Sequence, residues 1–506
     1  MRERLPLLAA LLLILIFGVL PVLYMTWKSL HGDISAYFDI LTHRNTLLLL
    51  RNSLLISVMT SLLSGIVGIP AGILLGRFRV PFGNAIALLI SIPLLLPPYA
   101  NAIAWSNFLE NNRWLTGFQG TVFVMFISFL PAVILLTMAY SRAVDSKLEE
   151  AALLHDDWKR TLLRITIPLM KEGLIFTIIL VFLLSMGEMS IPLFMNFRAF
   201  SVETFIHFSA FYDFESATAY STIMALVILT IILLEGRLLR KTEGATIFNN
   251  RFILIDTGTL RWMLFLILSL LAIVIAVVPY ASLLLNALKI QSLDILVQST
   301  GSLLRGILYA SSGATIITIL GLIAGYFISR GQEKYNQVID GMLLYLFALP
   351  GTVIAIGSIL LWNREWLAAI YSTPLVLIMG YTARYTFLTT RITASSLSML
   401  PASMDEAAEI AGAGPLKRII HILSPLIRRE VFAGWIVAFI FCFRDLDTTL
   451  LLYPPGQDTL TVRIFTIMAN GDPALISAMT LMLLTTVLMI IIFGAMGVKL
   501  IYDRWT

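Results

Sequence analysis

The sequence predicts an all-α membrane protein with about 12 transmembrane helices in two homologous six-helix halves. Of its 506 residues, 58% are hydrophobic and only 13% are charged, and the mean hydropathy is +0.90. Soluble proteins carry about 25% charged residues, so this composition indicates an integral membrane protein. The apolar residues form runs of about 20 residues, which can cross a bilayer as helices. Short motifs also recur at a fixed spacing, which indicates an internal repeat.

The first apolar run is interpreted as a membrane span because it is too long for a signal-peptide core and has no small-residue cleavage site. Glycines at spacings of three and four in the second span, from Gly65 to Gly76, predict close helix packing. The predicted spans are roughly 5–27, 52–76, 85–109, 121–141, 173–195 and 216–236, followed by 262–286, 303–329, 339–362, 371–395, 431–452 and 473–498.

The net charge of +5 is explained by topology. With the N-terminus and the C-terminus in the cytoplasm, the inside segments carry about 25 of the 35 lysines and arginines, which is the positive-inside bias of membrane proteins. A nucleic-acid-binding patch is therefore not expected. The single cysteine, Cys442, excludes disulfides within the chain, and no cysteine or histidine cluster has the spacing of a metal site.

The chain repeats itself with an offset of about 253 residues. LPPYANAIA at 96–104 matches LPGTVIAIG at 349–357, and further along the chain Glu188 matches Asp445 at an offset of 257. We therefore expect a first half at 1–245 and a second half at 246–506, each with six spans that start inside. Parallel repeats of this kind are a transporter architecture, and two such halves can enclose a path between them.

Two charged, amphipathic hairpins lie in cytoplasmic loops of this topology, at about 142–171 and about 397–430. The first contains EEAALLHDDWKRTLLRITIPLM and the second contains EAAEIAGAGPLKRIIHILSPLI. Each predicts two short helices, the first opened by a Ser-x-x-Glu capping box at Ser146 or Ser403. A single copy would be interpreted as an ordinary capped loop. Two copies in register on one membrane face favour a docking surface.

The second hairpin resembles the EAA motif of ABC-importer permeases, with Glu406, Ala407, Ala408 and Gly412 at the motif positions. The first copy fits in two registers, with either Glu149 or Glu150 at the glutamate position, and the motif glycine is absent. The resemblance implies the MetI-like permease fold and a coupling helix in each hairpin that seats in a separate ATPase subunit. The candidate coupling residues are Glu149, Glu150, Ala151, Ala152, His155, Glu406, Ala407, Ala408 and Gly412.

Two fused permease halves resemble the ferric-iron and thiamine importer permeases, and RDLDTTLLLYPPGQDTLTVRIFTIMANGD, at 444–472, is similar to the iron type. The resemblance implies a transport subunit with no catalytic residues or cofactor of its own. ATP and magnesium would bind a partner ATPase, expected as a homodimer, since the chain has no GxxxxGK[ST] motif. A solute-binding protein would deliver ferric iron, or alternatively thiamine or another small cation. A secondary transporter driven by an ion gradient is the alternative from another class.

Ionisable residues within predicted spans mark candidate functional positions, because burying them in a membrane is costly. Glu188 and Asp445 occupy matching positions of the fifth span in each half, and Arg444 and Asp447 lie beside Asp445. One hypothesis places these four side chains along the translocation path, where the carboxylates contact a cationic substrate. The other pairs Arg444 with Asp445 or Asp447 to hold helices together.

Overall fold

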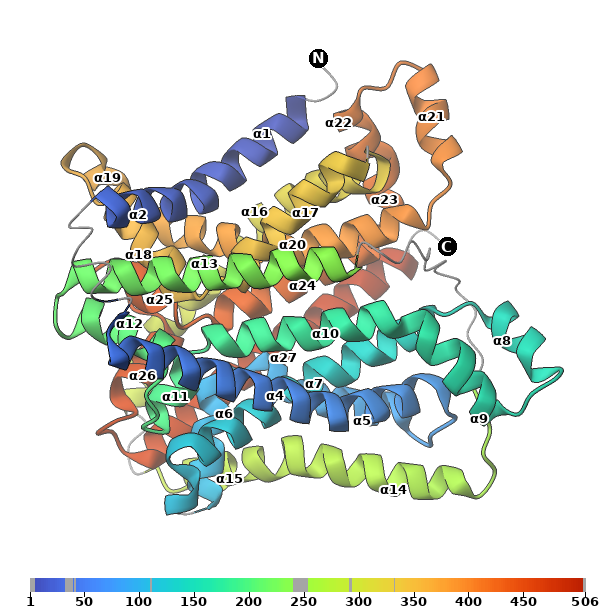
Figure 1. Ribbon diagram of the computed structural model, residues 1–506, viewed down its shortest axis with the longest axis horizontal. Coiled ribbons are helices and arrows are strands. Elements are labelled where there is room, and N and C mark those ends of the chain that lie inside the picture. The colour runs from blue at the N-terminus through green and yellow to red at the C-terminus, as the bar shows by residue number, and fades with distance from the viewer. Residues whose placement is uncertain are drawn as a thin grey trace. The chain divides into compact units, whose positions relative to one another are not determined.

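The computed structural model describes residues 5–31, 40, 42–109, 112–239, 254–290, 294–331 and 333–503 (Figure 1). Within these residues the chain is helical, and the one isolated β-bridge joins Phe78 to Ile255. The prediction of an all-α fold is therefore confirmed. The predicted boundary between the halves, at 245/246, lies outside the described residues.

Eleven of the predicted spans correspond to helices or bent helix pairs that are long and apolar enough to cross a membrane. Eight of them are single runs of helix in the described part of the chain, and the other three are pairs bent by 102°, 98° and 77°. The twelfth, predicted at 431–452, is interrupted: α24 (Arg428–Arg444) has only 17 residues, and α25 (Thr449–Leu452) follows a break at Asp445. The predicted fifth span, 173–195, is broken in the same way after Gly187.

Two of the three bends occur at the repeated Leu-Pro motifs. Pro97 and Pro350 are extended N-cap residues, with φ/ψ of −56°/146° and −53°/141°, and each precedes a new helix. Proline lacks an N–H and disfavours helical backbone in the residue before it, so the preceding helix ends there. The motif that identified the repeat in the sequence is therefore a helix break in both halves.

The helices group into two compact units, of which unit 2 comprises Leu47–Val202 and Leu233–Ile290. It holds most of the first half and also the seventh predicted span. Its helices are α4 (Arg44–Arg77), α5 (Gly83–Ser91), α6 (Pro98–Phe108), α7 (Gly117–Ala143), α8 (Ser146–Leu153), α9 (Trp158–Thr161), α10 (Ile167–Gly187), α11 (Ser190–Phe194), α14 (Leu260–Ala272) and α15 (Val278–Ala287), with the short segments η3 (Ile92–Leu95), η4 (Arg113–Leu115), η5 (Leu162–Thr166) and η6 (Ile273–Val277).

Unit 1 comprises Met1–Thr46, Glu203–Ile232 and Gln291–Thr506. It holds most of the second half together with the first predicted span and most of the sixth. Besides α24 and α25, its helices are α1 (Leu5–Ile14), α2 (Leu20–His31), α12 (Phe200–Ser209), the first part of α13 (Phe214–Leu239), α16 (Asp294–Arg330), α17 (Glu333–Ala348), α18 (Gly351–Trp362), α19 (Ala368–Tyr371), α20 (Leu375–Ser398), α21 (Ala402–Ile410), α22 (Pro415–Lys417), α23 (Ser424–Leu426), α26 (Leu460–Ile467) and α27 (Pro473–Asp503), with η2 (Leu15–Val19), η7 (Glu365–Leu367) and η8 (Arg418–Leu423).

The first span of each half packs in the unit that contains most of the other half. In unit 1, α1 packs on α16 and α2 on α18, while in unit 2 α14 packs on α5 and α15 on α6. The contact is close, because a Cβ added at Gly18 would lie 2.7 Å from the Leu346 side chain. The sequence repeats and the packing units therefore do not coincide.

Small residues let the second span of each half approach its neighbour closely. A Cβ added at Gly72 would lie 2.6 Å from the Ile134 carbonyl oxygen on α7, and one added at Gly321 would lie 2.6 Å from the Thr389 Cβ on α20. The glycine stripe in α4 thus serves helix packing, as the sequence indicates.

Candidate coupling hairpins and intramembrane carboxylates

The first hairpin is opened by Asp145, whose carboxylate accepts a hydrogen bond from the Lys147 N–H at 3.0 Å. Aspartate is a favoured N-cap because it satisfies a free N–H in the first helical turn. The predicted capping box is wrong here, since Ser146 is the first residue of α8 and not its N-cap. After the turn, Asp157 caps α9 in the same manner, accepting from the Arg160 N–H at 2.9 Å.

The second hairpin has no side-chain cap at its start. Pro401 occupies the N-cap of α21, and Ser403 is an exposed residue inside the helix, so the predicted capping box is wrong in this copy also. The second short helix begins at Pro415, where a missing N–H has no cost because that group would lack a helical partner.

Gly412 ends the coupling helix of the second hairpin with a left-handed residue, at φ +80°. The Gly412 N–H donates to the Glu409 carbonyl at 2.9 Å and the Ala413 N–H to the Ala408 carbonyl at 3.0 Å, which is the Schellman pattern. The first hairpin, all of whose residues are described, has no left-handed residue, and the His155 N–H donates to the Ala152 carbonyl at 3.0 Å. The two turns are therefore built differently.

The structure distinguishes the two registers that the sequence leaves open for the first copy. α8 and α21 begin 256 residues apart, which pairs Glu150 with Glu406 and Glu149 with Asp405. Glu150 and Glu406 are both exposed, whereas Glu149 and Asp405 are both buried. The surface pattern thus favours Glu150-Ala151-Ala152 as the counterpart of Glu406-Ala407-Ala408.

Glu149 faces the interior of the first hairpin. Its carboxylate forms an ion pair with the Arg77 guanidinium at 2.9 Å and accepts a hydrogen bond from the Thr166 hydroxyl at 2.6 Å. The Arg77 and Glu149 side chains are only 1% and 7% exposed. Burial raises the pKa of the Glu149 carboxyl above its ordinary value, opposed by the Thr166 hydroxyl and the Arg77 charge. Glu149 therefore joins α8 to the end of α4 and to η5.

Asp405 has the same role in the second hairpin, through different partners. It accepts a hydrogen bond from the Tyr326 hydroxyl of α16 at 3.0 Å and lies 3.5 Å from the Arg418 guanidinium of η8. Arg418 also pairs with Glu409 at 2.6 Å. In both hairpins, a buried acid just before the Glu-Ala-Ala sequence holds the coupling helix to the second span of its half.

Most of the remaining candidate coupling residues lie at the surface of the two hairpins. Glu150, Ala151, His155, Glu406, Ala407 and Gly412 are exposed, and Ala152 and Ala408 are half-buried. The most exposed large apolar side chain of each first helix and its C-cap is Leu154, at 80% exposure, or Ile410, at 89%, and these two lie 256 residues apart. Sequence analysis did not single these two out, although an apolar residue beside a charged hairpin was a usable signal. An exposed apolar side chain on a polar segment is typical of an interaction site.

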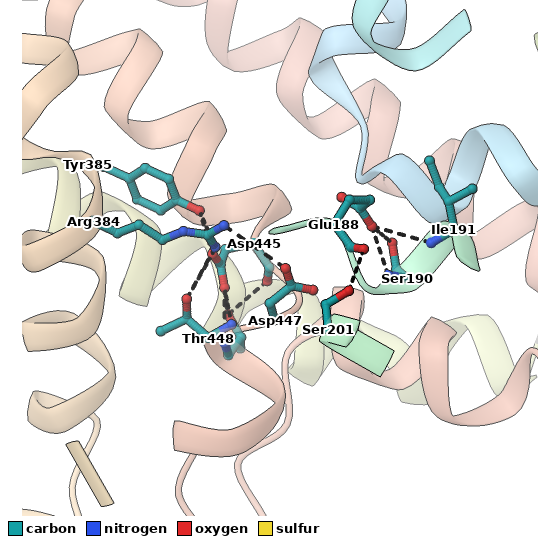
Figure 2. A network of polar contacts seen from close by, with 10 residues as sticks. Glu188, Ser190, Ile191, Ser201, Arg384, Tyr385, Asp445, Asp447 and Thr448 are labelled. Atoms are coloured by element: carbon teal, nitrogen blue, oxygen red, sulfur yellow. Dashed lines mark hydrogen bonds and ion pairs between the residues drawn. The ribbon is translucent and has the colours of Figure 1, made fainter. Parts of the chain in front are cut away.

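Glu188 lies at the break of the fifth span in unit 2 (Figure 2). It follows the last residue of α10, and its carboxylate accepts hydrogen bonds from the Ser190 N–H at 2.8 Å, from the Ser190 hydroxyl and from the Ile191 N–H at 3.3 Å. The Ser201 hydroxyl donates to its backbone carbonyl at 2.9 Å. The carboxylate thus caps α11, the short helix after the break.

Asp445 occupies the corresponding break in unit 1, directly after α24. Its carboxylate accepts hydrogen bonds from the Thr448 and Thr449 N–H groups at 2.9 and 3.0 Å, which caps the turn leading into α25. It also accepts a hydrogen bond from the Tyr385 hydroxyl and pairs with the Arg384 guanidinium at 2.6 Å (Figure 2). The Asp445 side chain is fully buried.

Arg384 is the functional candidate that sequence reasoning missed. It lies in the predicted span 371–395, so the rule that singled out Asp445 applied to it equally. Its guanidinium lies 4.0 Å from the Asp447 carboxylate as well. The Arg444 guanidinium lies over the Phe441 ring, 4.5 Å from the ring centroid. The corresponding helix of the first half, α7, carries no charged residue before Arg142, so the two breaks differ in charge.

No group of three or more histidine, cysteine, aspartate or glutamate side chains that could hold a metal ion occurs in the described residues. The ionisable groups at the two span breaks act instead as caps and ion-pair partners. Where a helix ends inside a span, backbone N–H and carbonyl groups lose their helical hydrogen-bond partners. In transporters, ion and substrate sites typically lie beside such broken helices.

Comparisons with known proteins match nearly the whole chain. A family model described as "Binding-protein-dependent transport system inner membrane component" matches residues 68–243 and 317–505, and each region contains one hairpin. "Putative ferric transport system permease protein FbpB 1" of Haemophilus influenzae is 23% identical, over 91% of this chain and 79% of the relative. "Ferric transport system permease protein FbpB" of Actinobacillus pleuropneumoniae is 21% identical (87% and 70%), and "Fe(3+)-transport system permease protein FbpB 2" of H. influenzae is 23% identical (93% and 95%).

Proposed function

The chain belongs to the family of binding-protein-dependent transport system inner membrane components, and from this premise we propose that it forms the translocation path of an importer driven by a separate ATPase. It is a multi-pass permease of the bacterial inner membrane with both termini in the cytoplasm. The observation that carries the proposal is the common face of the two hairpins. In both, the glutamate and first alanine of Glu-Ala-Ala are exposed, and a strongly exposed apolar side chain, Leu154 or Ile410, follows in the same register.

The two coupling helices seat in the two subunits of an ATPase homodimer, one under each hairpin. The apolar contact comes from Leu154 and Ile410, and the polar contacts come from Glu150 and Glu406 at the helix surface. ATP and magnesium bind only to that partner. Switching a path almost completely between two states takes about 5.5 kcal/mol of differential binding, which nucleotide binding can supply.

Ferric iron is the proposed substrate, because three relatives named for ferric transport each align with most of this chain. Thiamine and other small cations are the alternatives. A solute-binding protein delivers the substrate at the outer face. Glu188, with Arg444, Asp445 and Asp447, lies along the path, where carboxylates at broken helices contact a cationic substrate in passing.

Co-purification tests the docking role. Glu150→Ala and Glu406→Ala are expected to weaken capture of the partner ATPase, and the pair together is expected to weaken it more than either substitution alone. Glu365→Ala, an exposed acid on η7, is the matched control and should leave capture unchanged. Unchanged capture by the Glu150→Ala/Glu406→Ala double variant would show that the hairpins are not the docking surface.

A further inference from the structure

The stretch that leads into the second half is attached to the base of the first hairpin. We call Leu254–Asp256 the strap. The Ile255 N–H donates to the Arg77 carbonyl at 2.8 Å, and the Arg79 N–H donates to the Ile255 carbonyl at 3.0 Å. These bonds form the parallel bridge between Ile255 and Phe78. The strap is thus fixed, through its backbone, to the end of α4.

The Ile255 side chain packs against the apolar cluster beneath the first hairpin. This cluster includes Phe78 from the end of α4 and Met170 from α10, with Trp158 of α9 edge-on to Phe78 at 5.3 Å between ring centroids. Ile255 also lines a small crevice together with Glu149 and Thr166. The strap therefore contacts the end of the second span through its backbone and places an apolar side chain beside Glu149 of the hairpin.

The second half ties its hairpin partly in the same way and partly differently. The Arg77 guanidinium donates to the Val144 carbonyl at 3.3 Å. Arg330, the repeat counterpart of Arg77, donates to the Leu397 and Leu400 carbonyls at 3.2 and 2.9 Å. The buried acid Asp405 pairs with Arg418, which lies within the hairpin itself. In the first half the buried acid Glu149 forms its ion pair with the last residue of α4, whereas Asp405 contacts α16 through the Tyr326 hydroxyl. Ile255 of the strap lines the crevice beside Glu149.

We propose that the strap is a positioning element of the first coupling hairpin, which makes α8 and α4 move as one body during transport. The proposal rests on the proposed function. A hydrogen bond or ion pair gains strength where water is excluded, and the strap places an apolar side chain beside Glu149 of the Arg77–Glu149 contact. The exposed Arg79–Asp256 pair, at 3.5 Å, contributes little to this attachment.

The test uses the full chain in complex with its ATPase. Ile255→Pro removes the N–H that donates to Arg77, Ile255→Ser keeps that N–H but loses the apolar contact, and Leu254→Ser, at an exposed side chain, is the control. In Ile255→Pro we expect amide exchange at Arg79 to accelerate about tenfold. We also expect the ATP hydrolysed per substrate imported to rise about fivefold or more, with unchanged ATPase capture.

Ile255→Ser is expected to show the same two changes to a smaller extent, and it decides the matter if Ile255→Pro does not reach the membrane. Unchanged exchange at Arg79, or faster exchange with an unchanged ratio of ATP to substrate, would overturn the proposal. Failure of the proposed function has a different signature, because the unaltered chain itself would then capture no ATPase.

Discussion

At the scale of single residues, Asp445 shows how a charge is retained inside a membrane span. Its carboxylate caps α25, accepts a hydrogen bond from the Tyr385 hydroxyl and forms an ion pair with Arg384. Each of these contacts offsets part of the free energy lost when the carboxylate is removed from water. Glu188 caps α11 at the matching break. The position of each acid was predictable from the sequence, but its partners were not, because Arg384 and Asp445 are brought together only by the packing of α20 and α24.

Removing Arg384 is expected to destabilise the protein strongly. Arg384→Met leaves the buried Asp445 carboxylate without its ion-pair partner on α20. Breaking a buried ion pair lowers the free energy of unfolding by about 3–5 kcal/mol. Adding Asp445→Asn should recover part of this loss, since asparagine is also a good helix cap. Thermal unfolding in detergent measures both variants. Arg391→Met on the same helix, which breaks an exposed pair at 2.5 Å, should cost about 1 kcal/mol or less.

If the double variant were no more stable than Arg384→Met, Asp445 would not be the group that makes the loss of Arg384 costly.

Gly412→Ala is expected to loosen the second hairpin. At φ +80° a side chain costs about 1–2 kcal/mol, so exchange of the Gly412 and Ala413 amides should accelerate about 5- to 30-fold. Gly414→Ala is the matched control, because Gly414 has φ −67° and equally open space around it. Equal exchange in the two variants would mean that the left-handed turn does not stabilise the hairpin.

At the scale of elements, the sequence predicted that there are two hairpins, roughly where each begins and ends, and that they occupy matching positions in the two halves. Their capping boxes were wrong, because Asp145 and Pro401 take the N-cap positions instead of the serines. The role of Glu149 could not be predicted either. Its partner Arg77 lies 72 residues earlier in the chain, and only the closed hairpin brings the two together.

The exposed apolar residues are expected to supply much of the docking energy. Leu154→Ser and Ile410→Ser should each weaken ATPase capture, because burying a leucine or isoleucine side chain contributes about 1.5–3 kcal/mol, or roughly 10- to 150-fold in affinity. Trp366→Ser, which removes an equally exposed apolar side chain on the predicted outer face, should have no effect. Equal loss in all three variants would point to general misfolding instead of docking.

At the scale of the whole molecule, the two homologous halves follow from sequence repeats, but their packing does not. A repeat shows which segments share a structure, and it carries no information on which neighbour each segment contacts. The first predicted span and most of the sixth belong to unit 1, whereas the seventh belongs to unit 2, so each half gives at least one span to the packing unit of the other.

This exchange predicts that neither half is stable alone. Fragments 1–245 and 246–506, expressed separately, should be degraded or aggregate, because each leaves apolar surface uncovered where its exchanged span belongs. Expressed together they should form one complex on gel filtration. If either fragment alone were stable and monodisperse, the two halves would not depend on each other's spans for packing, which would contradict this prediction.

The central claim is that the hairpins transmit work from a separate ATPase to this chain. Uptake of ferric iron into proteoliposomes that contain the chain, the ATPase and the binding protein, with an uncoupler present, tests it most directly. The account predicts uptake that needs ATP and the ATPase, persists with the uncoupler and is lost in the Leu154→Ser/Ile410→Ser double variant. Concentrative uptake by the chain alone, or uptake that the uncoupler abolishes, would contradict it.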